Sequence, residues 1–218
     1  AMEAISTVSA QDFKRKALIL KMMTTLKEVC DTPALVNKVE TNSSPLDSGK
    51  MEQLFILLED LFEANRKVLI FTQYAKMGEL LQAWINEKFN LDCNFIHGQV
   101  SAINRSKMVD RFNTQLEDKA LILSLKAAGT GLNLTAATAV IHFDLWWNPA
   151  VEEQATDRTY RIGQDKNVMV HRLITLGTFE EKIDEMLKSK KELADLAVYE
   201  GEKIITELSD QEIYDIFS

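Results

Sequence analysis

Two arginines and a glutamine at helical spacing are the residues of this sequence best suited to chemistry. Gln154, Arg158 and Arg161 stand four and then three residues apart, so a helix would place all three on one face. A guanidinium is a permanently charged donor of fixed geometry, which suits the spread charge of a transferring phosphoryl group. The same arginines could instead form a row of surface ion pairs with Glu153 and Asp157. Spacing alone leaves both interpretations open.

The residues just ahead of this set predict a helix over 149–162. Asn148 is a favourable N-cap residue, and Pro149 suits the first helical turn. Trp146 and Trp147 precede the cap. We expect at least one of the two rings in the core, whereas an exposed ring at a strand end could lie against a nucleotide.

A second loop of unusual composition, 125–134, reads LKAAGTGLNL. Its Gly129 and Gly131 follow a short apolar run, and glycine lets a backbone approach a ligand closely. Backbone N–H groups at such a turn could contact phosphate. A tight strand-to-helix turn without a ligand explains the two glycines equally well, so both interpretations stay open here too.

Short apolar runs alternate along the chain with amphipathic segments. The runs predict strands at 68–71, 94–96, 120–123, 140–143 and 168–174. The amphipathic segments predict helices at 11–29, 50–64, 76–88, 101–114, 149–162, 178–197 and 209–217. This alternation predicts an α/β fold, a parallel sheet with helices on both faces. Ligands of such sheets meet the loops at the carboxyl ends of the strands, here 72–76, 97–101, 125–133 and 144–148.

The first 48 residues differ in pattern from the rest. Four apolar residues recur at helical spacing and are expected to face inward: Leu18, Met22, Leu26 and Val29. The stretch 37–48 has few apolar residues and is interpreted as an exposed linker. We therefore expect three parts: an N-terminal helix with its linker (1–48), a central lobe (49–178) and a C-terminal helical extension (179–218).

The formal net charge of −8 argues against bulk attraction to nucleic acid. Residues 179–218 hold 12 of the 33 acidic residues and 5 of the 25 basic ones, so most of the excess lies there. We interpret that segment as a solvated helical surface, so residues 1–178 could still carry a local basic face.

Cys30, Cys93 and three dispersed histidines form neither a disulfide framework nor a zinc site. We expect a cytoplasmic protein, associated with the nucleoid in a prokaryote.

Several stretches resemble the motifs of the Swi/Snf branch of helicase superfamily two. QATDRTYRIGQ resembles its motif VI, LILSLKAAGTGLNLTAA its motif V and KVLIFTQY its motif IV. HGQVSAINRSKMVDRF resembles the block after motif IV, and FDLWWNPAVEEQATDR spans the family's Trp-Asn-Pro junction. The resemblance covers 15–195 in the family's order, and the ending ITELSDQEIYDIF is similar to bacterial and archaeal members. Ala128 stands where many members have glycine, and its small side chain should be tolerated.

The resemblance implies a RecA-like second motor lobe of an ATP-driven translocase on duplex DNA. It implies that Arg158 and Arg161 are catalytic and reach the phosphates of ATP. The residues implied at the nucleotide are Gln154, Asp157, Gly129 and Gly131. The residues implied at DNA are Thr72, Gln73, His97, Gly98, Arg105, Lys126 and Trp147.

The chain contains no G-x-x-x-x-G-K-[ST] motif, since Ser48-Gly49-Lys50 lacks the first glycine. The resemblance therefore implies that ATP and Mg²⁺ bind mainly to a first lobe, which is the expected partner together with duplex DNA. We expect a monomer without a membrane partner that is inactive as an isolated chain.

Two alternatives belong to other classes. One is a non-catalytic docking module that uses the helix at 178–197, against which the arginine pair speaks. The other is the lobe of an RNA-directed helicase, against which the Trp-Asn-Pro junction and the Arg-Ile-Gly-Gln ending speak.

Overall fold

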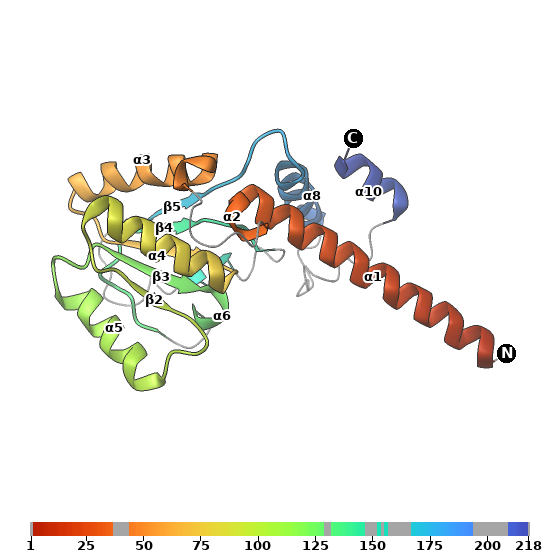
Figure 1. Ribbon diagram of the computed structural model, residues 1–218, viewed down its shortest axis with the longest axis horizontal. Coiled ribbons are helices and arrows are strands. Elements are labelled where there is room, and N and C mark those ends of the chain that lie inside the picture. The colour runs from red at the N-terminus through yellow and green to blue at the C-terminus, as the bar shows by residue number, and fades with distance from the viewer. Residues whose placement is uncertain are drawn as a thin grey trace.

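The computed structural model describes residues 2–36, 44–128, 132–146, 152–153, 155–156, 167–193 and 209–217. Its centre is a sheet of five parallel strands in the order β2-β3-β1-β4-β5 (Figure 1). The strands are β1 (Val68–Thr72), β2 (Asn94–Ile96), β3 (Ala120–Ser124), β4 (Ala139–His142) and β5 (Met169–Arg172). All residues of β1, β3 and β4 are buried, as expected for parallel strands covered on both faces.

Helices cover both faces of this sheet (Figure 1). The helices are α1 (Met2–Asp31), α2 (Pro33–Val36), α3 (Gly49–Glu63), α4 (Ala75–Phe89), α5 (Ala102–Thr114), α6 (Leu125–Ala128), α8 (Phe179–Leu193) and α10 (Asp210–Phe217), with a 3₁₀ turn, η1, at Pro45–Asp47. Helices α3 and α4 pack on one face against Val68 and Ile70, and α5 packs on the other against Leu69 and Phe71. Among the described residues, no helix is long and apolar enough to cross a membrane.

The predicted strands are confirmed, and so are α3, α4, α5, α8 and α10 to within a few residues at each described end. The short helices α2 and α6 were not predicted, and α6 lies in the expected loop 125–133. Helix α1 is longer than predicted but ends at Asp31, ahead of Pro33. Of the helix expected at 149–162, the described residues 152–153 and 155–156 are helical, and the others lie outside the described residues.

The expected inward stripe of α1 is wrong in part, because Met22 and Leu26 are half-buried against α8 and α10 but its other two members are exposed. Leu18 and Val29 are 68% and 49% exposed, whereas Ile19, Met23 and Lys27 are buried. The apolar residues of α1 are spread so broadly that two stripes one residue apart fit the pattern. Packing of Ile19 and Met23 against α8 and α10 selects the second stripe.

Two further interpretations are wrong in part. The last residue of the predicted linker 37–48 is not exposed. Ser48 is buried, its hydroxyl donates to the backbone carbonyl of Asp31 (2.6 Å), and it caps α3. Its residues 37–43 lie outside the described residues. The acidic C-terminal segment is not wholly solvated either, since Glu180 and Asp184 are 4% and 5% exposed. Both carboxylates have cationic partners that the linear pattern did not reveal.

Candidate functional site

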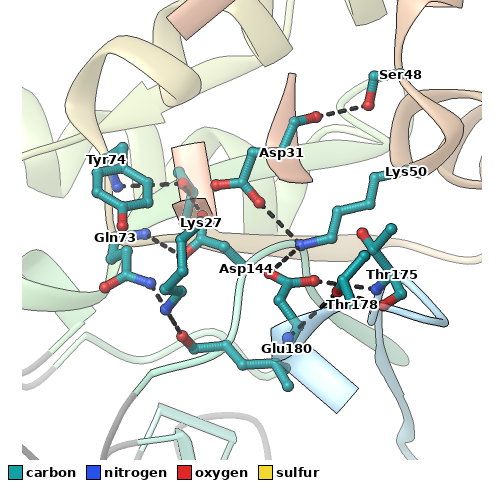
Figure 2. Close-up of polar contacts among 12 residues, drawn as sticks. Lys27, Asp31, Ser48, Lys50, Gln73, Tyr74, Asp144, Thr175, Thr178 and Glu180 are labelled. Carbon is teal, nitrogen blue, oxygen red and sulfur yellow. Dashed lines mark hydrogen bonds and ion pairs between the residues drawn. The ribbon is translucent and has the colours of Figure 1, made fainter. Parts of the chain in front are cut away.

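Asp144 fixes the loop that follows β1 at the carboxyl edge of the sheet. Its carboxylate is fully buried and accepts hydrogen bonds from the Thr72 hydroxyl and from the backbone N–H of Gln73 (2.9 Å). The Gln73 side chain in turn donates to the backbone carbonyl of Leu145 (2.9 Å), as Figure 2 shows. Because β1 and β4 are neighbours, their ends meet, and Asp144 ties the two loops together. Thr72 and Gln73, which the sequence predicted at DNA, are therefore held in place by hydrogen bonds to the loop that follows β4.

The loop after β2 lies at the same edge, since β2 runs parallel to β3 and β3 to β1. The half-buried His97 ring stacks on Phe95 with centroids 4.9 Å apart, and Gly98 is exposed. Arg105 donates from Nη2 to the Val100 carbonyl (3.2 Å), so its guanidinium supports this loop from α5. Their predicted contacts with DNA stay a prediction.

The loop after β3 is described in its first part only. Helix α6 begins directly after the strand, and the N–H of Ala127 donates to the Ser124 hydroxyl (3.3 Å). Lys126 belongs to α6, but its side chain lies outside the described residues. The other predicted site residues also lie outside them: Gly129, Gly131, Trp147, Gln154, Asp157, Arg158 and Arg161.

Glu152 belongs to the described part of the helix predicted at 149–162 and is anchored to the sheet. Its buried carboxylate accepts from the backbone N–H of Trp146 (2.7 Å) and from Nε of Arg172 (2.9 Å). Arg172 also pairs with Asp184 of α8 (2.8 Å). Burial raises the pKa of Glu152, and the Arg172 charge opposes that rise. The pairing of Glu152 with β5 leaves no trace in local spacing.

His142 holds the same helix one turn later. Its Nε2 lies 3.0 Å from the Thr156 hydroxyl, and its ring stacks on Phe71 with centroids 5.4 Å apart. Burial, together with the Arg172 charge, lowers the pKa of His142 to about 4, so the ring is neutral at pH 7. Ala155 packs in the core between these two anchors. The described residues of the helix are thus fixed to the ends of β4 and β5.

A buried group of charges lies beside this edge (Figure 2). Lys50 of α3 pairs with Asp31 at the end of α1 (2.9 Å) and with Glu180 of α8 (2.8 Å). Burial by itself would lower the pKa of Lys50, but the two carboxylates outweigh it and the net shift is upward. Lys27 of α1 donates to the Leu145 carbonyl, and burial lowers its pKa. Sequence reasoning missed this group, because charged residues on amphipathic helices normally predict a solvated face.

Comparison with known proteins places this arrangement in a family. Residues 49–163 match the family model described as the helicase conserved C-terminal domain. The chain belongs to this family. Over 211 residues it is 49% identical to YwqA of Bacillus subtilis (strain 168), an ATP-dependent helicase/translocase by name, and the match covers 96% of this chain and 23% of YwqA. The chain thus spans about a quarter of the length of this curated relative.

Solved structures narrow the family to its SWI2/SNF2 branch. The C-terminal domain of a Sulfolobus solfataricus SWI2/SNF2 ATPase superposes with a TM-score of 0.76 at 36% identity, covering 93% of this chain and 82% of that one. The core of a Sulfolobus solfataricus SWI2/SNF2 ATPase in complex with double-stranded DNA gives 0.82 at 41% identity, covering 93% and 42%. The expected RecA-like fold and the resemblance to the Swi/Snf branch are confirmed: the chain is the second lobe of a SWI2/SNF2-family helicase-like ATPase.

Proposed function

We propose that this chain is the second motor lobe of an ATP-dependent translocase on double-stranded DNA. In this proposal ATP and Mg²⁺ bind mainly to the first lobe, where ATP would supply the phosphoryl group that is transferred to water and Mg²⁺ would neutralise phosphate charge. Arg158 and Arg161 reach it across the cleft as arginine fingers, with Gln154 and Asp157 beside them. Among the described residues, no group of three or more His, Cys, Asp or Glu side chains could hold a metal ion.

The anchoring of the helix at Glu152 and Thr156 is the observation that supports the arginine assignment best. Both residues face the ends of the sheet, because one binds Trp146 and Arg172 and the other binds His142. Successive helical residues are about 100° apart. If the helix continues as the sequence predicts, Gln154, Arg158 and Arg161 fall on the face roughly opposite these anchors. On that condition the three side chains would point away from the lobe, as contacts with a partner lobe require.

The DNA contacts rest on the shared edge of the sheet. Thr72 and Gln73 follow β1 and His97 and Gly98 follow β2, so both loops meet at the carboxyl edge, where ligands of parallel sheets bind. Asp144 already holds the Thr72 hydroxyl and the Gln73 N–H, so the donor that this loop offers to a phosphate oxygen is the Gln73 amide, which uses one of its two hydrogens on Leu145. Lys126 belongs to α6, directly after β3, Trp147 is expected in the loop after β4, and Arg105 supports the second loop. The DNA complex of the Sulfolobus relative favours duplex DNA as the partner.

The test is ATP turnover by the full-length protein with duplex DNA, with duplex RNA and without nucleic acid. Because an arginine finger contributes roughly 10³–10⁵ in rate, Arg161→Lys should lower DNA-stimulated turnover by at least about 10³-fold while DNA affinity is kept. Arg66→Lys makes the same change ahead of β1, at the opposite edge of the sheet, and should leave turnover unchanged.

The isolated chain should show no turnover, since it supplies one side of the cleft only. Turnover of the Arg161→Lys protein at the wild-type rate would return this arginine to an ordinary surface ion pair. DNA-stimulated hydrolysis by the isolated chain would refute the division of the site between two lobes, and stimulation by duplex RNA alone would refute the DNA partner.

A further inference from the structure

Two side chains from distant parts of the chain share one acceptor at the carboxyl edge. The Leu145 carbonyl accepts from Nε2 of Gln73 (2.9 Å) and from Nζ of Lys27, which belongs to α1 (Figure 2). The preceding residue, Asp144, holds the Thr72 hydroxyl and the Gln73 N–H. The loop that we assign to DNA and the helix that enters the lobe are therefore joined through two consecutive residues.

Packing alone does not explain a lysine at this position. Lys27 is 2% exposed and continues the stripe that Ile19 and Met23 begin at four-residue spacing. A methionine there would extend the apolar stripe without the desolvation of an ammonium, and such replacements of buried charges are often neutral or stabilising. A buried ammonium is thus better explained by what it binds than by the space it fills.

The charge of Lys27 also acts on Asp144. Burial raises the pKa of Asp144, and the Lys27 ammonium is the largest opposing influence. The ammonium therefore favours the ionised form of this carboxylate, which accepts hydrogen bonds about twice as strongly as a neutral group. A shift of Lys27 would weaken the Thr72 and Gln73 contacts as well as its own bond to Leu145.

Helix α1 is well placed to move this lysine. It extends far beyond the sheet toward the N-terminus (Figure 1), and its buried side chains, among those described, lie between Ile19 and Asp31. The end of α1 therefore rests on the lobe, while its first turns project away from it. A force applied to the projecting part would be transmitted to the lobe through the few contacts at the other end.

We propose that Lys27 is a positioning residue that couples α1 to the 72–73 loop, so that the placement of α1 sets how firmly this loop grips DNA. The inference rests on the proposed function, because it takes the 72–73 loop to be a DNA contact. In a two-lobe motor, α1 would report movement of the chain that precedes the lobe to the DNA site.

The test compares Lys27→Met with Lys21→Met in the full-length protein. Lys21 is an exposed residue of the same helix and serves as the matched control. We expect Lys27→Met to raise the duplex DNA concentration for half-maximal ATPase stimulation about tenfold, the factor that loss of a hydrogen bond to a charged group produces. DNA-independent turnover should stay within about twofold, and Lys21→Met should match wild type.

A second comparison separates coupling from mere stability. If Lys27 acts through the loop, Lys27→Met should change the half-maximal DNA concentration much less in a Gln73→Ala background, because the two changes are then not additive. An unchanged half-maximal concentration together with a lowered melting temperature would mean that Lys27 only stabilises the fold, and would overturn the inference. Additive effects with Gln73→Ala would overturn it too.

Two controls keep the outcomes distinct. If Lys27→Met does not fold, Asp144→Asn, which keeps the size of the side chain and removes its charge, should produce the same rise in the half-maximal concentration. An unchanged value in that variant overturns the inference. Wild-type protein without any DNA stimulation would refute the proposed function, and the inference with it. Normal stimulation in wild type and Lys27→Met alike refutes the inference alone.

Discussion

Replacing Lys50 by methionine tests how the N-terminal helix is joined to the lobe. The Lys50 side chain is 3% exposed and lies between Asp31 and Glu180, whose side chains are 0% and 2% exposed. Methionine is an unbranched apolar side chain that can occupy much of the same space. The change thus removes the ammonium while both carboxylates remain buried, and it leaves them without this cation.

The size of the effect follows from burial. Removing one partner of a buried ion pair destabilises by about 3–5 kcal/mol, because the other charge stays out of water. Lys88 and Glu59 form an ion pair at the same 2.8 Å but are 38% and 51% exposed. Exposed pairs are worth about 0.2–1 kcal/mol. Lys50→Met should therefore lower the free energy of unfolding by about 4 kcal/mol, and Lys88→Met by less than about 1 kcal/mol.

The pH dependence gives the same prediction a second readout. Burial raises the pKa of Asp31, and Lys50 opposes this most strongly, so loss of the lysine raises that pKa further. A native carboxyl with a raised pKa binds protons that the unfolded chain does not, so the variant becomes less stable as pH rises. The deficit of Lys50→Met should therefore be larger at pH 7.5 than at pH 5.

Urea denaturation of the 218-residue chain, followed by circular dichroism and tryptophan fluorescence, measures both quantities. The reasoning would be refuted by a deficit of Lys50→Met no larger than that of Lys88→Met. A deficit that grows as the pH falls would show that the buried carboxylates are not the origin of the effect.

Two further changes test the core beneath the site. The pKa of His142 is about 4 in the folded chain and about 6.5 in the unfolded chain, so the unfolded state takes up the proton first as the pH falls. In urea denaturation, wild type should therefore lose about 2 kcal/mol more stability than His142→Gln between pH 7 and pH 5. Equal losses would show that the ring is solvated. A Cβ at Gly78 would lie 2.2 Å from the Phe95 ring, so Gly78→Ala should lower the free energy of unfolding by about 1–3 kcal/mol. Gly49 has open space around it, so Gly49→Ala should not lower the free energy of unfolding. Equal effects of the two changes would contradict the close packing at Gly78.

The sheet could be predicted from the sequence because its strands are short apolar runs. The run at 94–96 has the bounds of β2, and the others lie within a few residues of the observed strands. Buried parallel strands need apolar side chains on both faces, so the signal lies in each strand itself. The inward face of α1 could not be predicted in this way. Its partners, α8 and α10, come from the far end of the chain and are not visible in its own pattern.

In the candidate site, too, some positions could be predicted from the sequence and others could not. The positions of Thr72 and Gln73 follow from a rule about parallel sheets that needs only the order of elements. Asp144, Glu152 and Lys27 were not predicted as their supports, because a buried charge looks like a surface charge until its partner is known. Asp144 meets Thr72 across 72 positions, and Lys27 meets Leu145 across 118. No spacing rule connects residues so far apart.

The pairing of Lys50 with Glu180 also has a bearing on when the lobe becomes complete. Lys50 meets Asp31 across 19 positions but meets Glu180 across 130. Closing the longer loop costs roughly 1.7 kcal/mol more chain entropy, so the second contact belongs to the end of folding and involves a segment synthesised after all five strands. Contacts that form after the transition state govern how fast a protein unfolds. We therefore expect this ion pair to govern the lifetime of the folded lobe, with little influence on how fast the sheet assembles.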